Sequence, residues 1–303
     1  LTDELRASIL AADNPKRLED LYLPFKPKKR SLATAAREKG LEALAGSIWC
    51  RDPAVDNLAE VLTGMVNPEK ELNTPDDVLL GAQHILAEMI AETADVRAAV
   101  RHVLWDTGVL TTSRSEKLAE GQGQDYRDYF NFKEPIRQIP PHRILAINRG
   151  EKEQVLKVKV EVNPATAKEI AAYHLNLADH PHREFLDPVL DDALLRLVLP
   201  SLEREVRREL TDRAQEHAIQ VFAKNLRSLL LQPPIPKQVV LAIDPGFRTG
   251  CKVAVLDSNG KLLEHGVIHP HAPQNRRAEA KLFLKDLVGK HQIGVVAIGN
   301  GTA

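Results

Sequence analysis

The sequence predicts a multidomain, mainly α-helical protein, in which a helical N-terminal region and a long central helix precede a partial α/β domain. Apolar residues recur at three- and four-residue spacing through most of the first 130 residues, the period of a helix with one buried stripe. The same period returns over residues 190–231. After the proline-rich sequence "QPPIPK" (232–237), short apolar runs alternate with turn sequences. We expect four regions: a helical region at 1–133, a small mixed segment with a β-hairpin at 134–189, a long helical connector at 190–231 and a partial α/β domain at 237–303.

The composition is that of an ordinary globular protein. Of the 303 residues, 43% are hydrophobic and 27% are charged, which is enough to bury normal cores. The net charge of -1 neither indicates nor excludes a polyanionic partner. Cys50 and Cys251 are too few for a disulfide framework, so we expect a cytoplasmic protein. The longest apolar run, "LLRLVLP", is short and contains Arg196, so we expect no membrane span. An aromatic content of 4% argues against a surface built to stack bases.

Local patterns place a helix start and a strand in the first half of the chain. Thr74, followed by a proline and two acids, is a strong helix start, and the helical apolar pattern continues from there to Leu110. In "LKVKVEV" (156–162) apolar and charged residues alternate, which predicts a half-buried strand. The sequence "NRGE" (148–151) has the composition of a hairpin turn.

The pattern over residues 190–231 predicts one long helix, bent at Pro200. Its apolar stripe consists of Leu202, Val206, Leu210, Ala214, Ala218, Val221 and Leu229. From Ser201 to Leu231 such a helix spans about 45 Å, at about 1.5 Å per residue. That length favours a spacer or backbone element over part of a compact site.

The residues after 237 give a readable order of elements. "QVVLAID" predicts a strand, "CKVAVLD" and "LLEHGVIHP" predict two more joined by an Asn-Gly turn, "NRRAEAKLFLKDLVGKHQ" predicts an amphipathic helix, and "IGVVAIGNG" predicts a fourth strand. This order opens a ribonuclease-H-like fold, in which a right-handed crossover lays the last strand parallel to the first. A bare parallel edge strand is a poor end for a domain, so we expect the chain to be a fragment whose missing part completes the sheet.

Asp244 ends the first of these strands, directly before a Pro-Gly turn. In this topology its carboxylate lies beside the end of the fourth strand, where two acids would hold two divalent ions about 3.5–4 Å apart for phosphodiester cleavage. The residue at that second position is Asn300, whose amide is a weaker ligand for a hard cation. Asp244 is therefore the only catalytic candidate, and we expect no catalysis. The alternatives for Asp244 are turn formation, a phosphate contact, or the phosphate loop of an actin-like ATPase.

Seven stretches, spread in order over the whole chain, carry a family resemblance. They are "LEDLYLPFKPKKR", "AREKGLEALA", "HRILAINRGE", "LLQPPI", "VVLAIDPGFRTGCKVAVLD", "HPHAPQN" and "VVAIGNGTA". Together they closely resemble the Tex family of bacterial transcription accessory proteins. The resemblance implies a cytosolic factor that binds nucleic acid, RNA or DNA, and acts in transcription.

The resemblance also implies an architecture. It implies an elongated helical core similar to that of a eukaryotic elongation factor, and a resolvase-like module of the ribonuclease H fold after residue 236. Relatives of full length continue into helix-hairpin-helix modules and an oligonucleotide-binding barrel. The family's resolvase-like module is regarded as lacking nuclease chemistry, and Asn300 departs from the active resolvases in agreement with this.

Cationic side chains in two basic segments and beside the Asp244 turn are candidates for phosphate contacts. Two prolines hold "PFKPKKR" (24–30) extended, and residues 133–159 contain seven basic residues against three acids. Arg248 either binds a phosphate with its guanidinium fork or pairs with Asp244. For both basic segments, the alternative is a surface whose cations are solvated or paired with nearby acids. The nucleic-acid-binding candidates are Lys26, Lys28, Lys29, Arg30, Arg143, Arg149, Arg248 and Lys252.

The remaining reactive residues indicate no further site. Two His-Pro-His sequences point their rings apart, and no cysteine or acid cluster has metal-ligand spacing, so we expect no metal and no cofactor. Cys251 is expected to be a small buried apolar residue, and Trp49 and Trp105 are expected in the core. Two other functions stay open: a metal-dependent, structure-selective nuclease, and a protein-interaction scaffold on RNA polymerase or ribosome-associated proteins.

Overall fold

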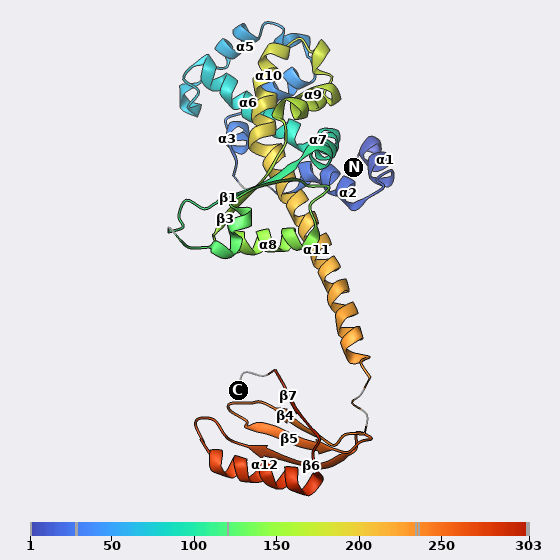
Figure 1. Ribbon diagram of the computed structural model, residues 1–303. Helices are drawn as coiled ribbons and strands as arrows, with labels where there is room; N and C mark the ends of the chain where they lie inside the picture. The colour runs from blue at the N-terminus through green and yellow to red at the C-terminus, as the bar shows by residue number, and fades with distance from the viewer. Residues whose placement is uncertain (1, 28–29, 120, 234, 236, 301–303) are drawn as a thin grey trace. The chain divides into compact units, whose positions relative to one another are not determined.

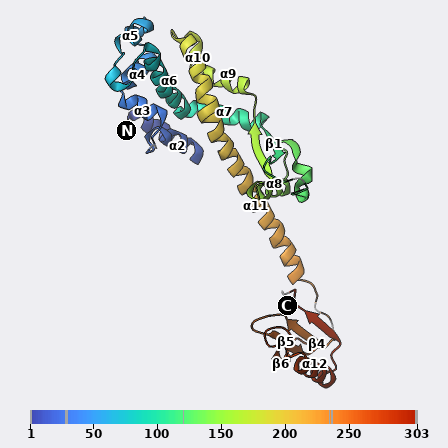
Figure 2. The ribbon, with the colours of Figure 1, turned by 90° about the vertical axis from the view of Figure 1, so that its left-hand side faces the viewer.

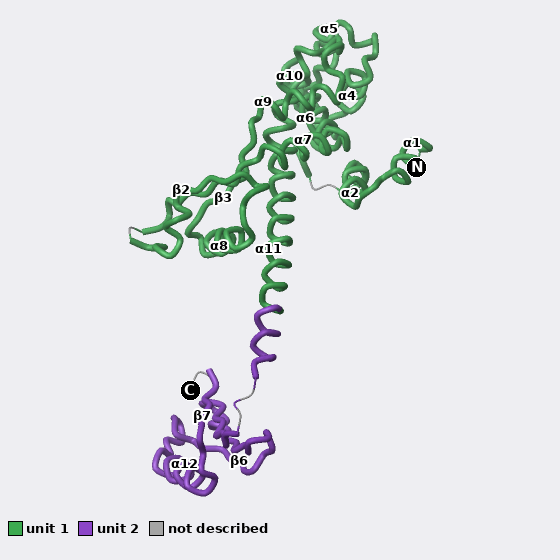
Figure 3. Tube along the Cα trace, turned by 45° about the vertical axis from the view of Figure 1, so that its right-hand side comes forward, with its two compact units in different colours: residues 1–223 green, residues 224–303 purple. Residues whose placement is uncertain are grey.

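A computed structural model describes residues 2–27, 30–119, 121–233, 235 and 237–300. The chain divides into two compact units, residues 1–223 and 224–303 (Figure 3). The first unit is helical around a small sheet, and the second is an α/β unit, so the predicted fold class is confirmed. No helix of the described residues is long and apolar enough to cross a membrane.

The first unit opens with short helices that pack around α6. Thr74 caps α6 with a complete capping box, in which its hydroxyl accepts from the Asp77 amide and the Asp77 side chain accepts from the Thr74 amide. The predicted helix start is therefore confirmed. The helices are α1 (Asp3–Leu10), α2 (Pro15–Tyr22), α3 (Leu32–Glu38), α4 (Glu42–Trp49), α5 (Leu58–Gly64), α6 (Pro75–Glu92) and α7 (Ala94–Thr107), with short 3-10 turns η1 (Leu23–Phe25), η2 (Pro53–Val55) and η3 (Pro68–Lys70).

The helical pattern expected to reach Leu110 ends earlier. Helix α7 ends at Thr107, Gly108 is extended, and Val109–Arg114 forms strand β1. The β-branched residues of "VLTTS" suit a pleated strand better than a helix. Leu110 is buried in the strand as it would have been in a helix, so apolar spacing alone did not separate the two.

Strand β1 is the centre of a three-stranded antiparallel sheet of order β2-β1-β3. Its partners are β2 (Asn131–Pro135), preceded by the 3-10 helix η4 (Gln124–Tyr129), and β3 (Leu156–Glu161). The strand predicted at 156–162 is confirmed, with Leu156, Val158 and Val160 buried and the residues between them exposed. The sheet crosses the boundary expected at residue 134.

The hairpin turn expected at "NRGE" is wrong. Residues Pro141–Lys152 form helix α8, which contains that sequence and packs on β3 (Figure 1). Strand β3 pairs with β1, more than 40 residues earlier in the chain, and the element directly before it is α8. Ile144 and Ile147 of α8 are buried. The apolar face of the helix therefore outweighs the turn composition of Asn148 and Gly150.

Helices α9 (Pro164–His174) and α10 (Arg183–Asp192), with η5 (Leu177–Asp179) between them, lead to the long helix α11 (Leu199–Leu230). A π-helical turn, η6 (Ala193–Val198), joins α10 to α11 without a break (Figure 2). The bend that we expected at Pro200 stays a prediction: the proline lies in the first turn of α11, and the π-helical turn ends two residues before it. The stripe of α11 is buried at Leu202, Val206, Leu210 and Ala214, and residues 219–230 are exposed.

The second unit is a four-stranded sheet of order β6-β5-β4-β7 with α12 on one face (Figure 1). Only β4 and β7 are parallel, so the predicted ribonuclease-H-like topology is confirmed. Leu241, Val253 and Val255 of the sheet form its core with Leu287 of α12. The elements are β4 (Val240–Asp244), β5 (Cys251–Leu256), β6 (Leu262–Ile268), α12 (Arg277–His291) and β7 (Val295–Ile298).

Candidate nucleic-acid interface

Asp244 is the last residue of β4, and its side chain is exposed. In the antiparallel register it lies directly opposite Lys252 of β5, so both side chains project from the same face of the sheet. This face is opposite to the one that buries Leu241 and Val253 against α12. Asp244 and Lys252 therefore meet solvent on the side of the sheet that α12 leaves uncovered.

The turn after Asp244 is folded back tightly on itself. A Cβ on Gly246 would lie 2.7 Å from the carbonyl oxygen of Gly250, and Gly250 has a φ of +80°. The turn packs on the second His-Pro-His sequence: a Cβ on Gly250 would lie 2.5 Å from the His269 ring, and Phe247 meets His271 edge-on at 5.4 Å between ring centroids. Both glycines are thus required by close backbone packing, and these histidines support the turn.

The end of β7 lies beside Asp244, as the topology predicts. The Gly299 amide donates to the Ile243 carbonyl at 2.8 Å, and a Cβ on Gly299 would lie 3.7 Å from Asp244 Oδ1. The next residue, Asn300, is exposed. Asp244, Lys252 and Gly299 line a hollow of about 730 Å³, and among its described lining residues Asp244 is the only carboxylate. One carboxylate opposite one ammonium is a poor arrangement for two divalent cations.

Arg248 is exposed in the turn, and Lys252 is exposed on its strand. Among the described residues, neither forms an ion pair within 4 Å, with Asp244 or any other carboxylate. The pairing of Arg248 with Asp244 that we considered is therefore not formed. Both cations are available to a phosphate.

The first basic sequence lies just after η1. Lys26 is exposed, and Lys28 and Lys29 lie outside the described residues. Arg30 is 80% exposed and approaches Glu38 at 3.6 Å, a pair that is worth little in water. Arg30 therefore stays accessible to a phosphate.

Arg143 and Arg149, two further candidates for phosphate contacts, both lie on α8. Arg143 donates to Glu134 at 2.8 Å and lies 5.5 Å from the centroid of the Phe132 ring. The hydrogen bond to Glu134 raises the pKa of Arg143. Arg149 is exposed and pairs with no described carboxylate. Of the two arginines, only Arg149 has a charge that is not already neutralised.

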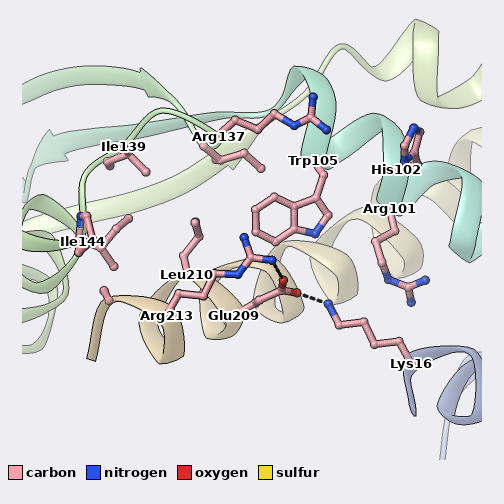
Figure 4. A pocket seen from close by; sticks show the side chains of 13 residues that line it. Lys16, Arg101, His102, Trp105, Arg137, Ile139, Ile144, Glu209, Leu210 and Arg213 are labelled. Atoms are coloured by element: carbon pink, nitrogen blue, oxygen red, sulfur yellow. Dashed lines mark hydrogen bonds and ion pairs between the residues drawn. The ribbon is translucent and has the colours of Figure 1, made fainter. Parts of the chain in front are cut away.

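The first unit contains a pocket of about 550 Å³ that the sequence did not suggest (Figure 4). Arg213 of α11 stacks on Trp105 of α7, with 4.8 Å from its Cζ to the ring centroid. Glu209 pairs with both Arg213 and Lys16. Glu209 is thus shared by two of the cations that line the pocket. Trp105 is partly buried against the core, as we expected.

His180 and Cys251 are buried parts of the structure. His180 is buried, and its Nδ1 accepts from the His182 amide at 3.1 Å; burial, then the charge of Arg51, lowers its pKa. Cys251 is buried and reduced. Within the described part of the chain no group of three or more His, Cys, Asp or Glu side chains is placed to hold a metal ion.

Comparison with known proteins assigns both units to one family. The family model described as Tex central region-like matches residues 52–222, and the one described as Tex protein YqgF-like domain matches residues 238–303. "Protein tex" of Bordetella pertussis is 40% identical, "Transcriptional accessory protein Tex" of Neisseria gonorrhoeae is 38% identical, and human "S1 RNA-binding domain-containing protein 1" is 33% identical. Each match covers 100% of this chain, which spans 40% of the two bacterial relatives and 31% of the human protein.

The matches agree with the architecture of both units: a helical unit with a long helix, and a ribonuclease-H-like sheet. The matches to the three relatives cover the whole chain and therefore all the stretches on which the resemblance rested. The central-region model alone matches more than half of the chain. The chain belongs to the Tex family.

Proposed function

We propose that this chain acts in transcription as a nucleic-acid-binding accessory factor of the cytoplasm. The family match over both units carries the proposal. Two relatives support it by name, one as a transcriptional accessory protein and one as a protein with an S1 RNA-binding domain. Because the chain spans about two fifths of its bacterial relatives, we expect it to bind nucleic acid weakly and with strong salt dependence.

The proposed phosphate contacts are the exposed cations without strong partners. Lys26, Arg30, Arg149, Arg248 and Lys252 are exposed, and Lys28 and Lys29 extend the first of these groups in sequence. Arg143 is the weakest of the candidates, because a phosphate would have to displace Glu134 from it. A nanomolar complex of this chain that does not respond to salt would contradict an interface built from such phosphate contacts.

We further propose that residues 237–303 form a module without nuclease activity. The supporting observation is the lone carboxylate of Asp244, which lies opposite Lys252 in the register and beside Gly299 after the end of β7, where the next residue in the sequence is Asn300. The test incubates the complete protein with branched and single-stranded substrates in Mg²⁺ or Mn²⁺. We expect no cleavage. Cleavage that Asp244→Asn abolishes would show an active metal-dependent nuclease instead.

A protein-interaction role is the second candidate, and exposed apolar residues favour it. On α11 the side chains of Ile219, Phe222 and Leu226 are 67%, 66% and 41% exposed, more apolar surface than a solvated helix needs. RNA polymerase or ribosome-associated proteins are the partners we propose. Pull-downs with and without nuclease treatment distinguish direct partners, which survive the treatment, from partners bridged by nucleic acid.

A further inference from the structure

The three-stranded sheet of the first unit has one polar, cationic face. The register places Lys133 of β2, Thr111 of β1 and Lys159 of β3 in one row across the sheet. The neighbouring row contains Asn131, Ser113 and Lys157. Directly opposite residues share a face, and residues two apart in a strand share it too. All six side chains therefore project from the same side.

This face is open, whereas the other face of the sheet is packed. The three lysines, Ser113 and Asn131 are exposed, and Thr111 is half-buried. The opposite face carries Leu110, Thr112 and Val158, which are buried, and α8 packs on that side (Figure 1). The open face is thus an accessible surface on a rigid, hydrogen-bonded sheet.

The positive charge of the open face is poorly balanced. Neither Lys133 nor Lys159 forms an ion pair within 4 Å with a described residue. Lys157 pairs with Glu116, but the two side chains are 52% and 87% exposed, and such a pair is easily exchanged for another partner. Among the paired residues of the sheet, Glu161 is the one acid on this face. The arginine on the α8 side, Arg143, is by contrast neutralised by Glu134.

We propose that the open face binds the sugar-phosphate backbone of single-stranded RNA. This inference rests on the proposed nucleic-acid-binding function and assigns it a surface. The lysines supply charge for phosphates. Between the lysines lie three polar side chains, those of Thr111, Ser113 and Asn131. Their hydroxyl and amide groups can donate hydrogen bonds to the 2′-hydroxyl of RNA and accept them from it, and DNA has no such hydroxyl.

The same face carries no base-stacking platform. Phe132, the aromatic residue of the three strands, lies on the packed side under Arg143. Without a stacked base, the face contacts the backbone and does not select sequence. Neighbouring strands are about 4.8 Å apart, so Lys133 and Lys159, two strands apart, start about 10 Å from each other and together reach successive backbone groups of one strand.

The first test measures salt dependence by fluorescence anisotropy, with the full chain and a labelled 12-nucleotide oligouridine. For single strands the slope of log affinity against log salt is about −0.7 per phosphate contact. The three lysines of the open face alone contribute about a 20-fold loss of affinity between 50 and 200 mM salt, beside any contribution from cations elsewhere. In Lys133→Gln/Lys159→Gln one contact of this face remains, and the contribution of the face falls to about 2.6-fold. The control Lys70→Gln/Lys281→Gln removes two exposed lysines elsewhere and keeps the wild-type slope.

The second test compares RNA with DNA of matched length, using oligouridine and oligodeoxyuridine. We expect RNA to bind more tightly, and Thr111→Val/Ser113→Ala to reduce that preference by about 2- to 10-fold, the value of a lost hydrogen bond. Valine keeps the shape and strand preference of threonine, so this double variant folds, as circular dichroism would verify.

The outcomes separate the surface from the function. If the wild-type chain binds RNA and Lys133→Gln/Lys159→Gln keeps its slope, the open face is refuted and the proposed function stands. If DNA binds as tightly as RNA, the assignment to RNA is wrong. If the wild-type chain binds no oligonucleotide at 50 mM salt, the proposed function fails and this inference with it.

Discussion

Replacing Asp20 with alanine tests whether a buried ionic network fixes the N-terminal helices on the first unit. Asp20 of α2 is 3% exposed and accepts from Arg97 Nε at 2.6 Å and from Arg101 Nη2 at 2.7 Å, both on α7. Arg101 also donates to Glu205 of α11 at 2.7 Å. Three helices that are distant in the sequence are thus joined by a network of two carboxylates and two guanidinium groups.

The free-energy cost of Asp20→Ala follows from the buried guanidinium that the substitution leaves without a carboxylate. In Asp20→Ala, Arg101 keeps Glu205, but Arg97, whose side chain is 8% exposed, keeps among the described residues only the Ser201 hydroxyl, at 3.4 Å. Removing one partner of a buried pair costs about 3–5 kcal/mol, because the other charge stays buried without compensation. At about 1.4 kcal/mol per tenfold change, amide hydrogen exchange in α2 should accelerate roughly 150- to 4,000-fold, or to its unprotected limit.

The chain provides a matched control for this experiment. Arg17 of α2 pairs with Asp95 of α7 at 2.6 Å, which joins the same two helices, but Asp95 is 62% exposed. Asp95→Ala should therefore cost less than about 1 kcal/mol, below about fivefold in exchange. Exchange in Asp20→Ala no faster than in Asp95→Ala would refute the reasoning. In Asp20→Leu/Arg97→Met both charges are gone, and protection should largely return.

The same geometry predicts three further results. In Gly150→Ala the new Cβ would lie 2.7 Å from Leu156 Cδ1 and 2.9 Å from Tyr126 Cδ1, so overpacking should lower the free energy of unfolding by about 1–3 kcal/mol. The control Gly46→Ala, in open space on α4, should raise it by about 0.5–1 kcal/mol. Urea unfolding measures both changes. Thr74→Ala should lower the free energy of unfolding by about 1 kcal/mol, because the cap of α6 is lost. The hydrogen bonds from the Thr74 hydroxyl and amide lower the pKa of Asp77. An NMR titration of the variant should therefore show that pKa rising toward 3.8. Burial lowers the pKa of His180 below 6.5. Its neutral form therefore stabilises the fold above pH 6.5, and this contribution is lost as the pH falls toward the folded-state pKa. The urea midpoint of His180→Gln should then fall less between pH 7 and pH 5 than that of the wild type.

The second unit was predictable from its sequence because its signals are local. The turn at 257–261 is determined by residues adjacent in the sequence. Gly260 takes a φ of +81°, and the Asp257 side chain accepts hydrogen bonds from the amides of Asn259 and Lys261. Strand alternation and the crossover rule then fix the order of the sheet. The position of Asp244 beside the end of β7 follows from that order alone.

The first unit was less predictable because its sheet depends on contacts distant in the sequence. Leu110 fits a helical and a strand pattern equally well, and its pairing with Val160 decides between them. Asn148 and Gly150 have turn composition, yet Gly150 lies in α8 because Leu156 and Tyr126 pack closely against it. Local propensity gives way to tertiary packing at both places. The pocket at Trp105 likewise needs α7 and α11 to be adjacent.

The basic segment at 133–159 shows why a surplus of charge in a sequence does not define a binding surface. Its cations separate according to strand alternation and helix face. Lys133, Lys157 and Lys159 fall on the open side of the sheet, whereas Arg143 falls on the packed side, where Glu134 meets it. Glu134 follows Lys133 directly, so adjacent residues of opposite charge serve opposite faces. A shift of one residue in the β1–β2 register would exchange them and turn the lysine inward. The register of the sheet therefore determines which positive charges are available to a polyanion. We expect a nucleic acid to bind at the lysines of the open face.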